Sequence, residues 1–128
     1  MISVCLASYN GEKYIKEQLD SILSQLNDED ELIVSDDGST DSTPEILSSY
    51  SEQFPILRIV KGPGKGVIKN FEYAISLAKG ELIFLSDQDD IWCSSKVSRV
   101  KEAFSSSGKN CMLVLHDAEI CLERNSYI

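Results

Sequence analysis

Short apolar runs alternate along this chain with longer segments of helical periodicity, and this alternation restricts the possible folds more than any other feature. The runs are rich in Val, Ile and Leu, and the first four are followed by turn residues such as Gly, Pro, Asn and Asp. Such runs are typical of strands that are buried on both faces. We predict five strands, at residues 2–7, 32–35, 56–60, 82–85 and 111–115.

Each gap between two predicted strands contains a predicted helix. The first helix has Ile15, Leu19 and Ile22 on one face, and Asn10 precedes it as a candidate cap. The other helices are expected after Pro44, over residues 67–78 with a left-handed cap at Gly80, and from Ser94 to Gly108. Because crossovers between parallel strands are right-handed, the order β-α-β-α-β-α-β-α-β predicts an α/β protein, a three-layer α/β/α fold with a mainly parallel sheet.

Length, charge and cysteine content exclude several classes of protein. The 128 residues are predicted to form one domain, residues 1–128. The formal net charge of −9 disfavours nucleic acid as a partner, since an acidic chain repels phosphates. The apolar runs are far shorter than the roughly 20 residues that span a bilayer, so we expect no membrane segment. The four cysteines show no Cys-x-x-Cys spacing, which favours buried, reduced thiols in a cytoplasmic protein.

The segments that follow the predicted strands are the first candidates for a functional site, because ligands of open parallel sheets bind beyond the carboxyl ends of the strands. Four of these segments are rich in Gly, Asp, Asn and Ser: residues 8–11, 36–41, 62–66 and 87–90. Parallel strands have their carboxyl ends at the same edge of the sheet. We therefore expect the four loops to converge there.

The loop after the fourth predicted strand is strongly acidic. Asp87, Asp89 and Asp90 place three carboxylates within four residues, and these repel one another unless a cation lies among them. Mg²⁺ and Mn²⁺ prefer such oxygen ligands, and they leave other positions for water and a diphosphate. The alternative is that Asp89 or Asp90 caps the following helix while Asp87 is solvated.

Asp36 and Asp37 offer a second pair of carboxylates, and Tyr9 offers an aromatic ring in a neighbouring loop. Either carboxylate is suited to accept the N–H of a pyrimidine base, and Tyr9 is suited to stack on that base. The alternatives are that Asp36 and Asp37 form a turn before a capped helix, and that Tyr9 lies at the edge of the core.

The remaining candidate groups give weaker signals. The glycine loop at residues 62–66 matches neither a P-loop nor the dinucleotide fingerprint. Lys65 or Lys69 is suited to neutralise a phosphate near the start of the third predicted helix, and two solvated lysines are the alternative. His116 is the single histidine, and without a Gly-x-Ser-x-Gly motif it argues against a Ser-His-Asp hydrolase.

Four segments together resemble the family 2 glycosyltransferases with the GT-A fold. They are residues 4–11 (VCLASYNG), 32–43 (LIVSDDGSTDST), 69–71 (KNF) and 80–92 (GELIFLSDQDDIW), in the order and spacing of that family. The resemblance covers nearly the whole chain. It implies the Rossmann-like fold of a nucleotide-diphospho-sugar transferase, a UDP- or dTDP-linked sugar donor, and transfer with inversion at the anomeric carbon.

The same resemblance implies a nucleotide site that consists of Ala7, Ser8, Tyr9, Asp37, Lys69 and Asp87. Tyr9 is expected to stack on the base, and Asp37 to accept a hydrogen bond from it. Lys69 stands where the family often has an arginine. Asp87 and Asp89 occupy the positions of the DxD motif and are expected to hold Mn²⁺ or Mg²⁺, with Asp89 as the more direct ligand.

Residues 86–92 (SDQDDIW) most resemble transferases that build bacterial polysaccharide, including rhamnosyltransferases. The implied acceptor is a saccharide or a lipid-linked saccharide, and the implied compartment is the cytoplasm, including the inner face of the membrane. The family usually continues into an acceptor-binding half. We therefore expect this chain to be the donor-binding portion, with the catalytic base beyond Ile128 rather than at Asp117 or Glu119.

Two other functions remain as alternatives to the transferase. A non-catalytic module that binds a nucleotide sugar would have the same site and would lack only turnover. A phospho-receiver signalling domain has a similar length, five alternating strands and an acidic Mg²⁺ pocket. In receivers, however, the acidic pair follows the first strand and the phosphorylated aspartate follows the third, whereas the acidic groups here follow the second and fourth predicted strands.

Overall fold

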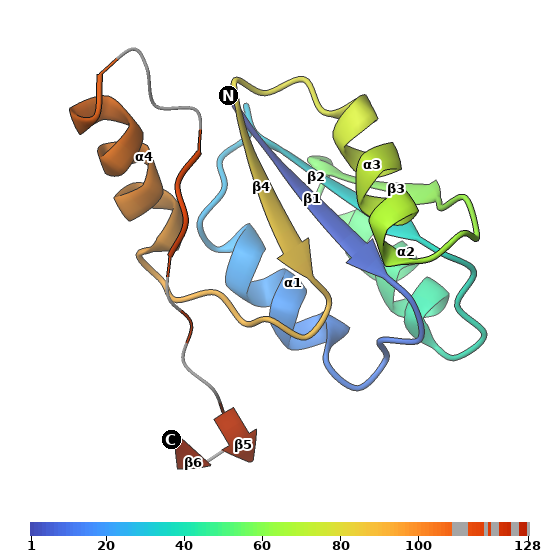
Figure 1. Ribbon diagram of the computed structural model, residues 1–128. Coiled ribbons are helices and arrows are strands. Elements are labelled where there is room, and N and C mark those ends of the chain that lie inside the picture. Colours follow the sequence, from blue (N-terminus) through green and yellow to red (C-terminus); the bar gives the residue numbers. More distant parts are fainter. Residues whose placement is uncertain (109–112, 117, 119–120, 124–125, 128) are drawn as a thin grey trace. The chain divides into compact units, whose positions relative to one another are not determined.

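The computed structural model describes residues 1–108, 113–116, 118, 121–123 and 126–127. These residues form two compact units, Met1–Ser94 and Ser95–Ile128 (Figure 1). None of the helices in the described part of the chain is both long enough and apolar enough to cross a membrane.

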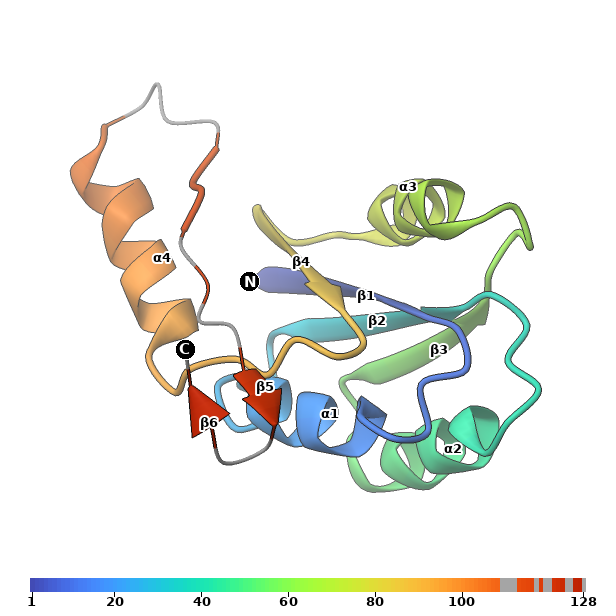
Figure 2. The same ribbon diagram turned by 60° about the horizontal axis from the view of Figure 1, so that its bottom comes forward.

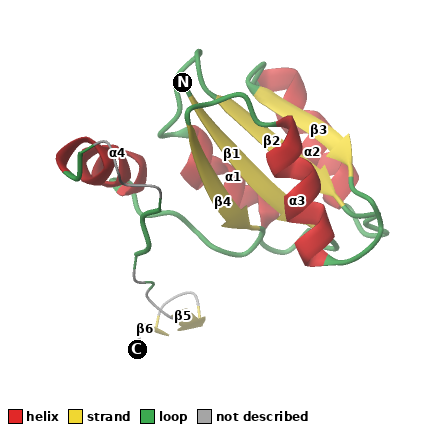
Figure 3. Cartoon of the chain, turned by 45° about the horizontal axis from the view of Figure 1, so that its top comes forward, coloured by secondary structure: helices red, strands yellow, loops and turns green. Residues whose placement is uncertain are grey.

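The first unit is built on a parallel sheet of four strands: β1 (Ile2–Ser8), β2 (Glu31–Asp36), β3 (Leu57–Lys61) and β4 (Leu82–Asp87). The strand order is β3-β2-β1-β4, so β1 and β2 are central and β3 and β4 are edge strands (Figure 3). In this register Ala7 of β1 lies opposite Ser35 of β2 on one side and Asp87 of β4 on the other. The carboxyl ends of three strands are therefore level with one another.

Helices cover both faces of this sheet. α1 (Ile15–Leu23) and α2 (Thr43–Gln53) lie on one face, and α3 (Val67–Leu77) lies on the other (Figure 2). The apolar stripe of α1 is buried, as its periodicity predicts, and α2 has its proline in the first turn. The prediction of an α/β, three-layer fold with a parallel sheet is confirmed.

The core is densest around the two central strands. Every residue of β1 is buried, and so are the four central residues of β2. On the α3 face, Cys5 and Ile33 pack against Ala74. Burial, and to a lesser extent the negative charge of Glu31, raise the pKa of the Cys5 thiol to about 11. Cys93, in contrast, is exposed, so the expectation of a buried thiol is wrong at that position.

The edge strands differ from the prediction that all strands are buried on both faces. In β4 only alternate side chains are buried, and Ile83 and Leu85 are 44% and 52% exposed. Ile59 of β3 is also exposed. Ile83 and Leu85 are exposed because α3 packs on β1 and β2, so that no helix of the described first unit covers this face of β4. An apolar run alone does not show whether a strand will be central or at an edge.

Two predicted helix boundaries also need correction. Asn10 does not cap α1; it has a positive φ of 48°, and its Oδ1 atom accepts a hydrogen bond from the backbone of Thr40 at 2.8 Å. Gly80 is not among the residues with positive φ. Glycine is required there for another reason, because a Cβ atom would lie 2.6 Å from the backbone carbonyl carbon of Ile2.

The second unit contains α4 (Lys96–Ser106) and an antiparallel pair of short strands, β5 (Cys121–Glu123) and β6 (Ser126–Tyr127). The predicted helix is confirmed, and it ends before Gly108, whose φ of +73° is left-handed. The strand predicted at 111–115 is not. Residues 111–112 lie outside the described residues, and 113–115 form no strand, with Leu113 and Leu115 largely exposed. An apolar run becomes a strand only where a neighbouring strand completes its hydrogen bonds.

Candidate functional site

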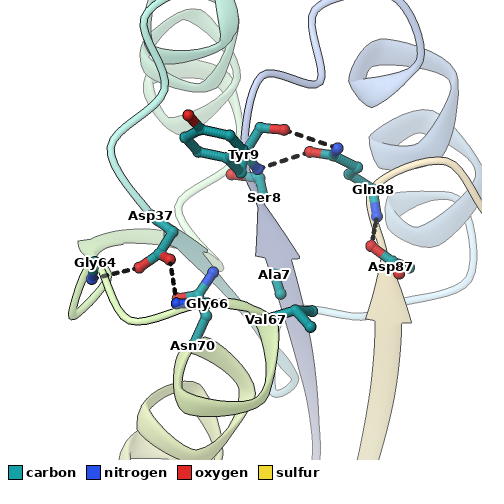
Figure 4. Close-up of a pocket in the computed structure, with 10 residues that line it drawn as sticks. All are labelled: Ala7, Ser8, Tyr9, Asp37, Gly64, Gly66, Val67, Asn70, Asp87 and Gln88. Atoms are coloured by element: carbon teal, nitrogen blue, oxygen red, sulfur yellow. Dashed lines mark hydrogen bonds between the residues drawn. The ribbon is translucent and has the colours of Figure 1, made fainter.

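A pocket of about 590 Å³ opens at the carboxyl ends of β1, β2 and β4, beside the first turn of α3 (Figure 4). Its lining comes from the loops that the sequence predicts to converge. Five of the six predicted nucleotide-binding residues are among the lining residues: Ala7, Ser8, Tyr9, Asp37 and Asp87. The sixth, Lys69, is not; its ammonium group lies 2.6 Å from Glu72, and both side chains are more than half exposed.

Hydrogen bonds join the loop after β1 to the loop after β2. The backbone N–H of Asn10 donates to the Ser39 hydroxyl at 2.8 Å, and the N–H of Gly11 donates to the Thr43 hydroxyl at 2.9 Å. Together with the bond from Thr40 to the Asn10 side chain, these contacts tie the two loops along several residues. These polar residues therefore bind the two loops to each other beside the pocket.

Asp41 strengthens the same connection. Its carboxylate accepts from the backbone N–H groups of Thr43 at 2.9 Å and Glu12 at 3.1 Å. Partial desolvation raises the pKa of Asp41, but these hydrogen bonds and one from the Thr43 hydroxyl outweigh it and hold the pKa below its ordinary value. The carboxylate therefore keeps its charge, and its bonds between the loops, to a lower pH than an ordinary aspartate would.

Asp36 and Asp37 are equally suitable by chemistry alone, and the family resemblance selects Asp37; the structure gives the two carboxylates different environments. The Asp36 carboxylate accepts from the hydroxyls of Ser8 at 2.7 Å and Ser39 at 2.6 Å, so it belongs to the turn. Asp37 instead lies in the pocket, where its two oxygens accept from the backbone N–H groups of Gly64 at 2.6 Å and Gly66 at 3.3 Å. Asp37 is thus the carboxylate available to a ligand.

The glycine loop between β3 and α3 forms the cradle for that carboxylate. Gly64 and Gly66 have φ values of +67° and +90°, which suit glycine far better than other residues. Gly62 has no room for a side chain, because a Cβ atom would lie 2.5 Å from Asn70 Oδ1 and 2.6 Å from Asp37 Oδ1. The sequence gives these glycines no specific role, and the structure shows that they hold Asp37.

Asn70 is a lining residue that the sequence analysis missed. Its side chain is only 2% exposed, and its Nδ2 atom donates to the carbonyl oxygen of Ser35 at 2.8 Å. This bond turns the Oδ1 atom away from Ser35, and Oδ1 has no hydrogen-bond partner among the residues that the structure describes. The only sequence signal was its place in the KNF triplet at 69–71, in which the sequence analysis assigned a role to Lys69 alone. Asn70 therefore joins α3 to the end of β2, and its unpaired Oδ1 atom lies beside Gly62.

Tyr9 lies at the mouth of the pocket and is not a core residue, since 56% of it is exposed. The alternative that it sits at the edge of the core is wrong. Its backbone is held on both sides by Gln88: the Tyr9 N–H donates to Gln88 Oε1 at 2.8 Å, and Gln88 Nε2 donates to the Tyr9 carbonyl at 2.9 Å (Figure 4). The ring is therefore carried on a fixed segment and is free to contact a ligand.

The acidic loop after β4 has one carboxylate in the pocket. Asp87 lines it, and its Oδ1 atom accepts from the backbone N–H of Gln88 at 3.0 Å. Asp89 and Asp90 are exposed and are not lining residues. The residue that precedes α4 at its cap is Ser95, so the alternative in which Asp89 or Asp90 caps that helix is wrong.

The carboxylates of this loop suit a divalent cation whose remaining coordination positions are filled by a bound ligand. Among the described residues, no three Asp, Glu, His or Cys side chains gather into a full metal cage. One or two exposed carboxylates, with water and phosphate oxygens in the other positions, are what Mg²⁺ and Mn²⁺ accept in nucleotide sites. The described lining residues include two carboxylates and no Lys or Arg. A diphosphate in this pocket would need a cation.

Solved structures define the class of protein to which this fold belongs. TarS of S. aureus matches 82% of this chain, and 32% of its own chain, with 30% identity and a TM-score of 0.73. The mannosyltransferase PcManGT of Pyrobaculum calidifontis, solved with GDP-Man and Mn²⁺, matches 79% of this chain and 31% of its own, with 28% identity and a TM-score of 0.73. The fold is the GT-A fold of glycosyltransferases, as the resemblance implies.

The family follows from the sequence comparisons. The model of glycosyl transferase family 2 matches residues 3–124, and the chain belongs to that family. The dTDP-rhamnosyl transferase RfbG of Shigella flexneri is 37% identical over 112 residues, which are 83% of this chain and 39% of that protein. The chain spans between about a quarter and a half of the length of the curated relatives it matches. Family membership, with acidic residues after β2 and β4, argues against a phospho-receiver domain.

Proposed function

We propose that this chain is the donor-binding portion of a glycosyltransferase, residues 1–128, that holds a UDP- or dTDP-linked sugar through Mn²⁺ or Mg²⁺ and transfers the sugar with inversion. The observation that carries the proposal is the arrangement of the pocket. Asp37 and Asp87 come from different strands and lie in one cavity, with the exposed ring of Tyr9 at its mouth.

Base recognition is assigned to Tyr9 and Asp37. The Tyr9 ring offers a flat face for stacking, and the held carboxylate of Asp37 accepts a hydrogen bond from the base edge. Uracil, thymine and guanine carry a ring N–H that can donate to a carboxylate, whereas adenine and cytosine in their usual forms do not. RfbG is named a dTDP-rhamnosyl transferase, and TarS has been solved with UDP-GlcNAc. These relatives support a uracil or thymine nucleotide.

Diphosphate binding is assigned to the acidic loop after β4. Asp89 and Asp87 would hold the cation, with Asp89 as the more direct ligand and Asp87 at the pocket wall. When bound, the cation supplies the positive charge that stabilises the departing diphosphate. Lys69 remains a candidate nucleotide contact, because an exposed ion pair such as the one with Glu72 contributes little and is easily exchanged.

The acceptor side lies outside the described pocket. We propose a saccharide or lipid-linked saccharide as acceptor, in bacterial polysaccharide synthesis at the inner face of the membrane, in line with the names of RfbG and of the putative teichuronic acid biosynthesis glycosyltransferase TuaG of Bacillus subtilis. The free thiols of Cys5 and Cys93 are consistent with a cytoplasmic protein. The base that deprotonates the acceptor hydroxyl is expected beyond Ile128; Asp117 and Glu119 lie outside the described residues.

Isothermal titration calorimetry tests the proposal directly. The chain is titrated with UDP, dTDP, GDP, ADP and CDP, each with Mn²⁺, with Mg²⁺ and with EDTA. We expect binding of UDP or dTDP that requires the cation, and at least tenfold weaker binding of ADP and CDP. Asp28→Asn, an exposed change away from the pocket, serves as the control and should bind like the unchanged chain. Equal affinity for all five nucleotides, or binding unaffected by EDTA, would refute the proposed site.

A further inference from the structure

The side chain of Gln88 forms a closed pair of hydrogen bonds with the backbone of Tyr9. Its Oε1 atom accepts from the Tyr9 N–H at 2.8 Å, and its Nε2 atom donates to the Tyr9 carbonyl at 2.9 Å (Figure 4). Both functional groups of the amide are therefore used on one residue, 79 positions away in the sequence. Two bonds in this arrangement fix the orientation of the Tyr9 peptide as well as its distance.

Gly11 shows how closely the Gln88 side chain fits. A Cβ atom at Gly11 would lie 2.5 Å from Gln88 Oε1 and 2.9 Å from its Cδ atom. Gly11 is not among the glycines with positive φ, so its backbone does not by itself require glycine. The absence of a side chain at this position is explained by the space that Gln88 occupies.

The backbone of the same residue contacts the acidic end of the pocket. The Gln88 N–H donates to Asp87 Oδ1 at 3.0 Å, which turns the carboxylate that lines the cavity. Gln88 thus contacts Tyr9 through its side chain and Asp87 through its main chain.

We infer that Gln88 is a positioning residue that holds the Tyr9 ring at a fixed separation from the Asp87 carboxylate. The inference rests on the proposed function, in which the base lies at Tyr9 and the diphosphate near Asp87. A nucleoside diphosphate has a limited separation between these two groups, so both ends bind at full strength only if the protein groups are held at the matching separation. Gln88 would supply this match before the ligand arrives.

Two substitutions break the pair of hydrogen bonds from opposite sides. Gln88→Ala removes the amide, and Gly11→Ala leaves Gln88 in the chain but displaces its flexible end. Gln53→Ala is a matched control, because Gln53 is an exposed glutamine whose side chain donates hydrogen bonds to Ser49 within α2. Hydrogen exchange of the Tyr9 amide, followed by NMR in the free protein, reports the pair without any ligand.

We expect the Tyr9 amide to exchange at least tenfold faster in Gln88→Ala and in Gly11→Ala, while the amide of Leu6 in β1 keeps its rate. With Mn²⁺ present, UDP or dTDP should bind about 5–10-fold more weakly to each variant. The variant that combines Gln88→Ala with Gly11→Ala should bind these nucleotides no more weakly than Gln88→Ala alone. The reason is that Gly11→Ala acts through the Gln88 side chain, which Gln88→Ala has already removed. Manganese pyrophosphate, which lacks a base, should bind Gly11→Ala within twofold of the unchanged chain.

Three results would overturn the inference: an unchanged Tyr9 exchange rate in Gln88→Ala, additive losses in the double variant, or equal losses for pyrophosphate and nucleotide in Gly11→Ala. The last would mean a general structural role. If the unchanged chain bound no nucleotide at all, the proposed function would be refuted, and the exchange rates would still decide whether Gln88 holds Tyr9.

Discussion

Asp37 Oδ1 lies 2.6 Å from the backbone nitrogen of Gly64, so the glycine loop holds this carboxylate in the pocket. A second bond, from the N–H of Gly66 at 3.3 Å, engages the other oxygen. Two backbone donors keep the group oriented at little further cost in side-chain entropy. A ligand that donates a hydrogen bond to Asp37 therefore meets an acceptor that is already in place.

The first prediction concerns Asp37 itself. Asp37→Asn keeps the shape of the side chain but replaces one acceptor oxygen by an NH₂ group. This donor would face another donor, either a backbone N–H of the glycine loop or the ring N–H of the base, and one hydrogen bond would be lost. Since hydrogen bonds to a charged group contribute about 1.5–3 kcal/mol, we expect UDP or dTDP to bind roughly 10–150-fold more weakly. Calorimetry measures the affinity, and circular dichroism checks the fold. Unchanged affinity would remove Asp37 from the base site.

The second prediction concerns stacking on Tyr9. The ring is 56% exposed, so its removal should cost the fold little. Tyr9→Ala is expected to weaken nucleotide binding by about 1–3 kcal/mol, the range for base–aromatic stacking, while Tyr9→Phe keeps the affinity within about threefold. Fluorescence or calorimetric titration with UDP and dTDP distinguishes the two variants. Equal losses in both would point to the hydroxyl group rather than the ring face.

The third prediction separates the two acidic residues of the DxD pattern. Asp89→Asn should abolish the increase in UDP or dTDP affinity that Mn²⁺ produces, because Asp89 is the expected direct ligand. The fold should stay intact, since Asp89 is exposed. Asp90→Asn, one residue further on, is the matched comparison and should retain most of the metal effect. A metal dependence that survives in Asp89→Asn would exclude Asp89 as the ligand.

The fourth prediction concerns alkaline stability and Cys5. The thiol ionises near pH 9 in the unfolded chain and at about pH 11 in the folded protein, because burial and the charge of Glu31 disfavour the thiolate. A raised pKa stabilises the fold fully below pH 9, and this contribution is lost as the pH rises through 11. Unfolding free energies of the unchanged chain and Cys5→Ala should therefore converge by ~2 kcal/mol between pH 8 and 11.

Urea unfolding at several pH values measures that convergence. Comparison with Cys5→Ala cancels other alkaline titrations, including that of Tyr50, whose pKa is raised first by burial and then by its contact with Asp20. Parallel curves for the two proteins across this range would show that Cys5 does not ionise with unfolding.

The sequence predicted the order of the first four strands and of the four helices, and the loops that meet at the pocket. Hydrophobic period and turn residues are local signals, and they identified β1 to β4 and α1 to α4. The rule that loops converge at the carboxyl edge of a parallel sheet then brought Tyr9, Asp37 and Asp87 into one pocket. Each of these inferences needs only near neighbours in the chain and one general rule of topology.

Other features depended on residues far apart in the chain. Whether an apolar strand is buried on both faces depends on its place in the sheet, as Leu85 on the edge strand β4 shows. Gly80 is glycine because β1 passes beside it, and not because of a left-handed cap. Local periodicity contains no information about such neighbours.

The roles of single side chains in the pocket were decided in the same way. Apart from the family resemblance, nothing in the local sequence distinguishes Asp36 from Asp37, and nothing marks Gln88 as a partner of Tyr9. The first distinction depends on Gly64, 27 residues away, and the second pairing joins residues 79 positions apart. The sequence by itself determined which residue types reach the edge of the sheet. Only the tertiary structure decided which of them face a ligand and which hold the others in place, because hydrogen-bond partners are set by distance in space.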